Sequence, residues 1–220
     1  MSENGILEAI AAGDLERVQS AIGDDPVAAA ARREDGLSAV TLAAYHGQGA
    51  ILEALLAAGP PLDVFEAAIA GRDERVSELL SERPELARAE GPDGYTALHL
   101  AAFFDHPSIV DMLLESGANP NHVAPGQGNR TPLHSAAAAP SRDAVASLLA
   151  AGADPDASQE GSFRPIHEAA QNGDEALVDL LLANGADPSL TTGDGRDAAA
   201  LARDAGHEDL ARRLEGALAR

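Results

Sequence analysis

One sequence unit recurs along most of the chain, and residues 93–121 contain it in its fullest form. Thr96 stands where a helix N-cap belongs, and apolar residues follow at helical spacing over 98–102. After a turn, a second apolar stripe covers 109–114, and Gly117 then supplies a left-handed helix stop. The unit is therefore a narrow helix-turn-helix pair with apolar surface on both flanks. Such a pair can bury that surface only by stacking against neighbouring copies of itself.

Two later copies share a more specific sequence motif. The first has Thr-Pro-Leu-His at 131–134 and Leu-Leu-Ala-Ala-Gly-Ala-Asp at 148–154. The second has Arg-Pro-Ile-His at 164–167 and Leu-Leu-Ala-Asn-Gly-Ala-Asp at 181–187. This motif resembles that of the ankyrin repeat, which starts with Thr-Pro-Leu-His and ends with Leu-Leu-x-x-Gly-Ala-Asp. The resemblance covers nearly the whole chain and implies an all-α ankyrin-repeat solenoid of about seven helix-turn-helix units with short β-turn fingers.

The copies can be aligned on the position that His99 occupies. The equivalent residues are Leu7, Thr41, Phe65, His99, His134, His167 and Ala200. The intervals between them are 34, 24, 34, 35, 33 and 33 residues. The interval between Thr41 and Phe65 is short by the length of one projecting finger. We therefore expect Gly59, Pro60 and Pro61 to join two helix pairs directly.

A second period of 58 residues relates Gly13 to Gly71 and Pro26 to Pro84, so the first half is interpreted as a duplicated two-unit block. The chain is predicted to form a single domain over 1–220, with polar or charged end units acting as caps. The expected units are 6–33 (N-terminal cap), 34–59, 60–90 (lacking the preceding finger), 91–125, 126–159, 160–192 and 193–220 (C-terminal cap).

Some positions depart from the repeat pattern. Arg164 replaces the capping threonine, which predicts a loss of about 1 kcal/mol unless Ser162 substitutes for it. Asp105 and Pro140 replace glycines between the paired helices, so those turns are expected to differ in detail. At the C-terminal cap, Asp197 takes the helix N-cap position.

The composition bears mainly on the partner. The formal net charge is −21, all 15 cations are arginine, and such an acidic chain disfavours nucleic acid or an anionic membrane as a partner. A basic partner protein fits better, although the carboxylates could simply solvate the outer faces. There is no cysteine, and no secretory signal or membrane-spanning stretch is recognisable, so a cytoplasmic monomer is expected.

Three histidines recur once per unit, at His99, His134 and His167. The resemblance implies that each bonds near its own helix start and bridges to the neighbouring repeat. Adjacent repeats would hold the rings too far apart for a shared metal ion. No carboxylate pair, phosphate-binding loop or calcium loop is recognisable either, so the sequence predicts no catalysis and no cofactor.

The aromatic residues are the most informative candidates for a binding site. Five of the six fall on variable positions of the repeat, which in the resembled fold face the concave groove: the finger residue before the cap and the end of the first helix. Aromatic and arginine side chains are frequent interface anchors. Alternatively, one or two of them, Phe103 first, pack between neighbouring repeats. The candidate partner-binding residues are Tyr45, His46, Tyr95, Phe103, Phe104, Arg130, Phe163, Arg164, Gln171, Asn172 and Arg196.

These observations favour a non-catalytic protein–protein interaction module that binds a partner through its concave groove and finger tips. Two rival functions remain open. One is an inhibitor or immunity-type protein that neutralises a basic enzyme, and the other is a metal-dependent regulator or enzyme that uses the three histidines. A self-assembling scaffold is a third, weaker alternative. Fold alone does not specify the partner.

Overall fold

The computed structural model of the protein describes residues 3–139 and 141–218. Within these ranges it consists of helix pairs joined by turns. The pairs are α1 (Glu3–Ala11) with α2 (Leu15–Asp24), α3 (Ala39–Tyr45) with α4 (Gly49–Ala57), α5 (Val64–Ile69) with α6 (Asp73–Glu82), α7 (Ala97–Phe103) with α8 (Pro107–Glu115), α9 (Pro132–Ala138) with α10 (Arg142–Ala150), α11 (Pro165–Asn172) with α12 (Glu175–Ala183), and α13 (Ala198–Asp204) with α14 (Glu208–Leu218).

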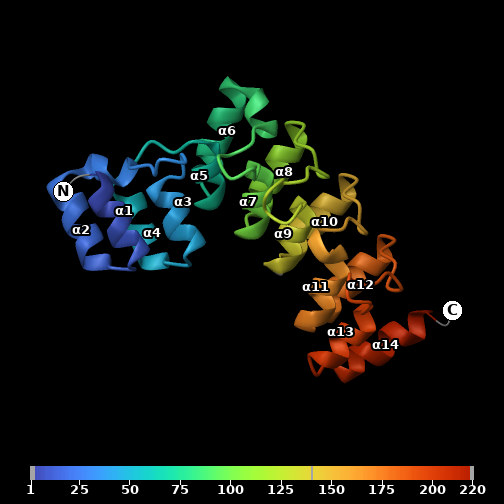
Figure 1. Cartoon of the computed structure of the whole chain (residues 1–220). Coiled ribbons are helices and arrows are strands. Elements are labelled where there is room, and N and C mark those ends of the chain that lie inside the picture. Colours follow the sequence, from blue (N-terminus) through green and yellow to red (C-terminus); the bar gives the residue numbers. More distant parts are fainter. Residues whose placement is uncertain (1–2, 140, 219–220) are drawn as a thin grey trace.

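The pairs stack into a curved array (Figure 1), with α5, α7, α9 and α11 along the inner side and α6, α8, α10 and α12 along the outer side. Short fingers connect successive pairs. In the described part of the chain, β-type pairing is confined to isolated bridges in three of these fingers, at Arg32–Ser38, Glu90–Thr96 and Ala124–Arg130. The predicted all-α solenoid of helix-turn-helix units is confirmed.

The 58-residue period of the sequence is also present in the structure. Helices α2, α3 and α4 are repeated at that offset by α6, α7 and α8. The turns expected at Pro26 and Pro84 are short 3-10 helices, η1 (Pro26–Ala30) and η2 (Pro84–Arg88). Each has proline in its first turn, where the missing N–H costs nothing. A third one, η3 (Glu160–Ser162), lies in a later finger.

No finger lies between the second and third helix pairs, as the spacing of the sequence predicts. Residues 58–63 run directly from the end of α4 to Asp63, which caps α5 by accepting the backbone N–H groups of Phe65 and Glu66 at 2.9 Å each. The buried apolar residues divide at this place into two clusters. One holds residues from Ile6 to Leu55, and the other runs from Ala44 to Leu214. The two clusters meet at the junction between the second and third pairs, where Ala44 of α3 belongs to the second cluster and the partly buried Leu52 and Leu62 pack against both.

Polar contacts hold this junction. The Arg32 guanidinium, from the first finger, lies 3.0 Å from a carboxylate oxygen of Asp63 and 3.0 Å from one of Glu66. Glu66 is 4% exposed, and its other oxygen accepts the Asp63 N–H at 2.8 Å. A buried carboxylate is tolerated only when it is paired and hydrogen-bonded, so Arg32 is its essential counter-ion.

The residues that depart from the repeat pattern, or cap its last unit, differ in their local structure. Asp197 caps α13 as predicted, accepting the Ala200 N–H at 2.7 Å. Asp105 adopts the left-handed conformation of the glycine it replaces, with φ of 59°. The expectation that Ser162 could act as the cap of α11 is wrong, because the Arg164 N–H donates to His167 Nδ1 at 3.1 Å and no hydroxyl caps this helix. Pro140 lies outside the described residues.

One contact between successive pairs can be tested at Gly173. It has φ of +70°, and a Cβ added there would overlap the His207 ring of the next pair. Gly152 has φ of +87° with nothing within 4 Å of such an atom. We expect Gly152→Ala to cost about 1 kcal/mol for the left-handed backbone, and Gly173→Ala to cost roughly 1–3 kcal/mol more because the ring is displaced. Urea unfolding of both variants measures this, and equal losses would show that His207 moves without penalty.

The junction gives a second prediction. Arg32→Ala leaves Glu66 without its counter-ion, so we expect a loss of about 1–3 kcal/mol and earlier opening of residues 3–57 than of the rest. The matched control is Arg33→Ala, because Arg33 pairs with Asp35 of its own finger. Hydrogen exchange measured by mass spectrometry reports the opening of each segment. Uniform acceleration along the chain would contradict the role given to Arg32.

Candidate functional site

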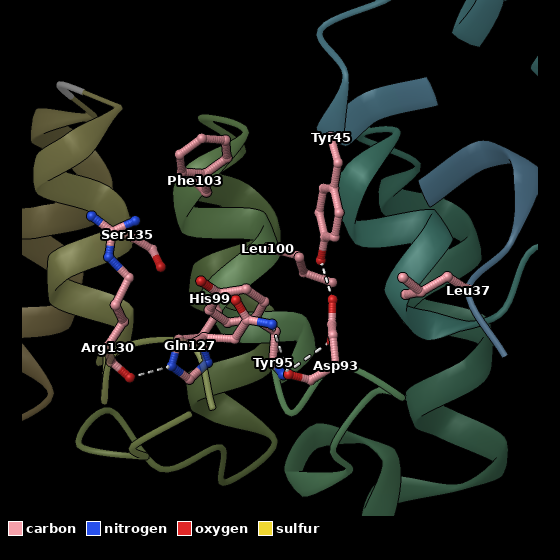
Figure 2. A pocket seen from close by; sticks show the side chains of 10 residues that line it. All are labelled: Leu37, Tyr45, Asp93, Tyr95, His99, Leu100, Phe103, Gln127, Arg130 and Ser135. Carbon is pink, nitrogen blue, oxygen red and sulfur yellow. Dashed lines mark hydrogen bonds between the residues drawn. The ribbon is translucent and has the colours of Figure 1, made fainter. Parts of the chain in front are cut away.

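A hollow of about 350 Å³ opens where the finger is missing. Figure 2 shows it between the end of α3 on one side and helices α7 and α9 on the other. We call it the junction hollow. The ten residues that line it are Leu37, Tyr45, Asp93, Tyr95, His99, Leu100, Phe103, Gln127, Arg130 and Ser135. They come from the α3, α7 and α9 units and their fingers, while the α5 unit between them contributes no lining residue because it has no finger of its own.

Tyr45 crosses the hollow to the next finger. Its hydroxyl donates to Asp93 Oδ2 at 2.5 Å, although the two residues are 48 positions apart. Burial of the phenol, and then its bond to Asp93, raises the pKa of Tyr45 far above the ordinary value. Asp93 Oδ1 accepts the Tyr95 N–H at 3.1 Å, and this local turn fixes the fingertip. The Asp93 carboxylate is thus held in one orientation at the edge of the hollow.

Two exposed aromatic rings form opposite walls of the hollow in Figure 2. Tyr45 is 40% exposed and Phe103 is 43% exposed, whereas most other large apolar residues of the described chain are covered. The alternative in which Phe103 packs between repeats is wrong. Phe104 packs against the core instead, and its ring meets the edge of Phe103 with centroids 5.2 Å apart. Phe103 is therefore free to contact another molecule.

The recurring histidines are structural, as the resemblance implied. His99 Nδ1 accepts from Thr96 of its own helix start, and its Nε2 donates to the carbonyl of Arg130 in the next finger at 3.2 Å. His134 and His167 repeat this arrangement with the carbonyls of Phe163 and Leu190 at 3.3 and 2.9 Å. Both ring nitrogens are engaged in all three. Burial lowers the pKa of His99 and of His134 to about 4, and lowers the pKa of His167.

Arg130 lies on the wall opposite Asp93 (Figure 2), with its guanidinium beside Ser135. Its Nε donates to Gln159 Oε1 at 2.8 Å, which fixes the side chain to the following finger. Gln127 donates from its amide to the Asp93 carbonyl at 3.4 Å. The hollow therefore has a negative side and a positive side, with an apolar floor that includes Leu100.

The structure brings four of the predicted residues together here, namely Tyr45, Tyr95, Phe103 and Arg130. It places the others elsewhere. Phe163 is half-buried against His167, with ring centroids 5.4 Å apart, and Arg164 donates to the carbonyls of Ser162 and Thr191. Phe104 packs against the core, and the remaining four are exposed: His46 after α3, Gln171 and Asn172 at the end of α11, and Arg196, which pairs with Asp194 and Asp204.

The sequence interpretation missed Asp93 as a site residue. A signal existed, because removal of one finger brings the last residue of α3 within reach of the finger after the gap. Among the described residues, no three His, Cys, Asp or Glu side chains gather closely enough to hold a metal ion. Likewise, none of the helices described is long and apolar enough to cross a membrane.

Comparison with protein families matches the description of three-copy ankyrin repeats over residues 6–124 and 64–159, and of a single ankyrin repeat over 163–193. The chain belongs to the ankyrin repeat family. Repeats of this family generally mediate protein–protein interaction and are typically non-catalytic.

Three curated proteins are similar to parts of this chain. A segment of 56 residues, 26% of the chain, is 52% identical to human Neurogenic locus notch homolog protein 4, of which it covers 3%. Half of the chain is 35% identical to the Neurogenic locus Notch protein of Drosophila melanogaster, covering 4% of it. The palmitoyltransferase Hip14 of the same organism is 35% identical over 46% of the chain, which covers 17% of that protein. The chain thus spans a small part of the length of each relative.

The buried histidines predict a pH dependence of stability. In the unfolded chain His134 protonates near its ordinary pKa of 6.5, whereas the folded chain holds that pKa at about 4. Stability is therefore fully present above pH 6.5 and is lost as the pH falls toward 4, by roughly 3 kcal/mol for this residue. His134→Gln should reduce the slope of unfolding free energy against pH between 6 and 5 by about one proton. Urea titrations across this range test it, and an unchanged slope would contradict it.

Proposed function

We propose that this protein is a non-catalytic binding module that holds a partner protein in its concave groove, with the junction hollow at the centre of the contact. The observation that carries the proposal is the pair of exposed rings, Tyr45 and Phe103, on opposite walls of a hollow that is already open. Large exposed aromatic side chains in a concave site are the usual anchors of protein interfaces.

The hollow is held in its open shape by hydrogen bonds. Tyr45 is tied to Asp93, Asp93 to Tyr95, and Arg130 to Gln159. A partner would therefore meet side chains whose rotamers are already restricted. Binding to such a site costs little conformational entropy, so more of the contact energy is available as affinity.

The groove continues beyond the hollow over later repeats. We propose that Gln171 and Asn172, both exposed at the end of α11, give the partner polar contacts that fix its register. His46 extends the contact at the end of α3, while Phe163 and Arg164 contribute from their finger. Phe104 supports Phe103 from behind, and Arg196 reaches the same surface only if its pairs with Asp194 and Asp204 open.

We further propose that the partner is basic. The protein has a formal net charge of −21, and a field of that sign accelerates the approach of a cationic surface. Charges at the rim act mainly on the association rate and on the rejection of acidic proteins. Affinity would come from the aromatic centre.

The test compares Phe103→Ala with Val27→Ala. Val27 is 73% exposed in η1, so its replacement removes exposed apolar surface outside the hollow. We expect protein captured from a native lysate by the wild type to be retained by Val27→Ala and lost from Phe103→Ala. With the purified partner, Phe103→Ala should weaken binding roughly 10- to 100-fold by calorimetry.

Melting temperatures of both variants serve as the folding control, because neither side chain is buried. Capture of the same proteins by Phe103→Ala and by the wild type would place the binding surface outside the hollow. The proposal would then be wrong.

A further inference from the structure

We infer that the junction hollow receives an arginine side chain of the partner, with its guanidinium against Asp93 and its plane along the aromatic walls. This inference rests on the proposed function and names the chemistry that the same site would recognise. Three features of the hollow lead to it: a fixed carboxylate, two exposed rings facing each other, and the position of the one arginine among its lining residues.

The first feature is the acceptor capacity of Asp93. Each of its carboxylate oxygens receives one hydrogen bond from the protein, Oδ2 from the Tyr45 hydroxyl and Oδ1 from the Tyr95 N–H. An ionised carboxylate can accept about four hydrogen bonds in all. One lone pair therefore stays available on each oxygen, and the group is only half-buried. That is the arrangement that the two parallel N–H donors of a guanidinium require.

The second feature is the aromatic surface above this carboxylate. Tyr45 reaches down to Asp93 from one wall, and Phe103 stands on the other (Figure 2). A guanidinium is planar and weakly hydrated, so it stacks on aromatic rings and pairs with a carboxylate at the same time. The apolar floor at Leu37 and Leu100 would cover the methylene stem of the side chain. A lysine ammonium offers a point charge and no planar face, so it would bind more weakly.

The third feature is Arg130, which could argue for the opposite ligand. A partner carboxylate could pair with Arg130 while its stem lay against Phe103. The charge of the whole molecule, −21, opposes an anion in any part of the groove. Arg130 is moreover held at the far wall by Gln159, which directs an incoming cation toward the Asp93 side. Removing the Arg130 charge should therefore help an arginine ligand and harm a carboxylate ligand.

The experiment uses a displayed library of random peptides, selected on the full chain and on three variants: Asp93→Asn, Arg130→Gln and Phe103→Ala. Asparagine keeps the shape of Asp93, its oxygen can accept from the Tyr95 N–H, and its amide can donate to the Tyr45 hydroxyl, so both contacts are kept while the charge and the second acceptor oxygen are lost. We expect the wild type to enrich peptides with arginine at one fixed position. Synthetic copies should lose at least tenfold in affinity on Asp93→Asn, and bind Arg130→Gln as tightly or more tightly.

A second comparison varies the peptide on the wild-type protein. Replacing the fixed arginine by lysine should cost less than replacing it by norleucine, which keeps the stem and removes the charge. Melting curves test whether Asp93→Asn is folded. If it is not, Arg130→Gln and the peptide replacements decide the question on their own.

The outcomes separate this inference from the proposed function. Peptides that depend on Phe103 but carry an acidic or purely apolar residue at the fixed position would overturn the arginine assignment alone. Loss of binding on Arg130→Gln with none on Asp93→Asn would do the same. Selected peptides that bind Phe103→Ala unchanged, or a library that yields no peptide dependent on Phe103, would contradict the proposed function as well.

Discussion

Stacking between neighbouring helix pairs is the interaction on which this structure depends. No pair can bury its flanks alone, because its first helix is narrow and rich in alanine, so each pair is stable only against the next. The recurring histidines link each of their repeats to the next one along the chain. Each of the three holds its own helix start with one nitrogen and the next finger with the other, so the fingers that follow α8, α10 and α12 are tied to the repeat before them. A structural change in one repeat therefore alters the repeats beside it.

The missing finger is such a change, and it has two consequences. Two clusters of buried apolar residues meet there, and Arg32 between two carboxylates adds a polar contact across the junction. The space of the absent finger also becomes the junction hollow, which Tyr45 spans to reach Asp93. The Arg32 contact and the junction hollow thus both lie where one finger is absent.

The sequence alone was sufficient to predict the structural features that the repeat pattern determines. The helix pairs, the absent finger, the 58-residue duplication and the capping role of Asp197 follow from spacing and local residue chemistry. Contacts that the repeat does not encode could not be predicted. Phe103 and Phe104 are adjacent on one helix, and only the packing of the neighbouring pairs decides that the second turns inward and the first outward. The bond from Tyr45 to Asp93 skips one repeat, so no nearest-neighbour rule describes it.

The position of the hollow also links recognition to stability. Its walls belong to both parts of the divided core, since Tyr45 ends α3 and Phe103 ends α7. A ligand that touches both walls adds a contact across the junction where the two clusters meet. Because a ligand that binds only the assembled form stabilises that form, occupancy would couple the two halves of the stack. A partner held at this place would thus rigidify the whole groove, including repeats that it does not touch.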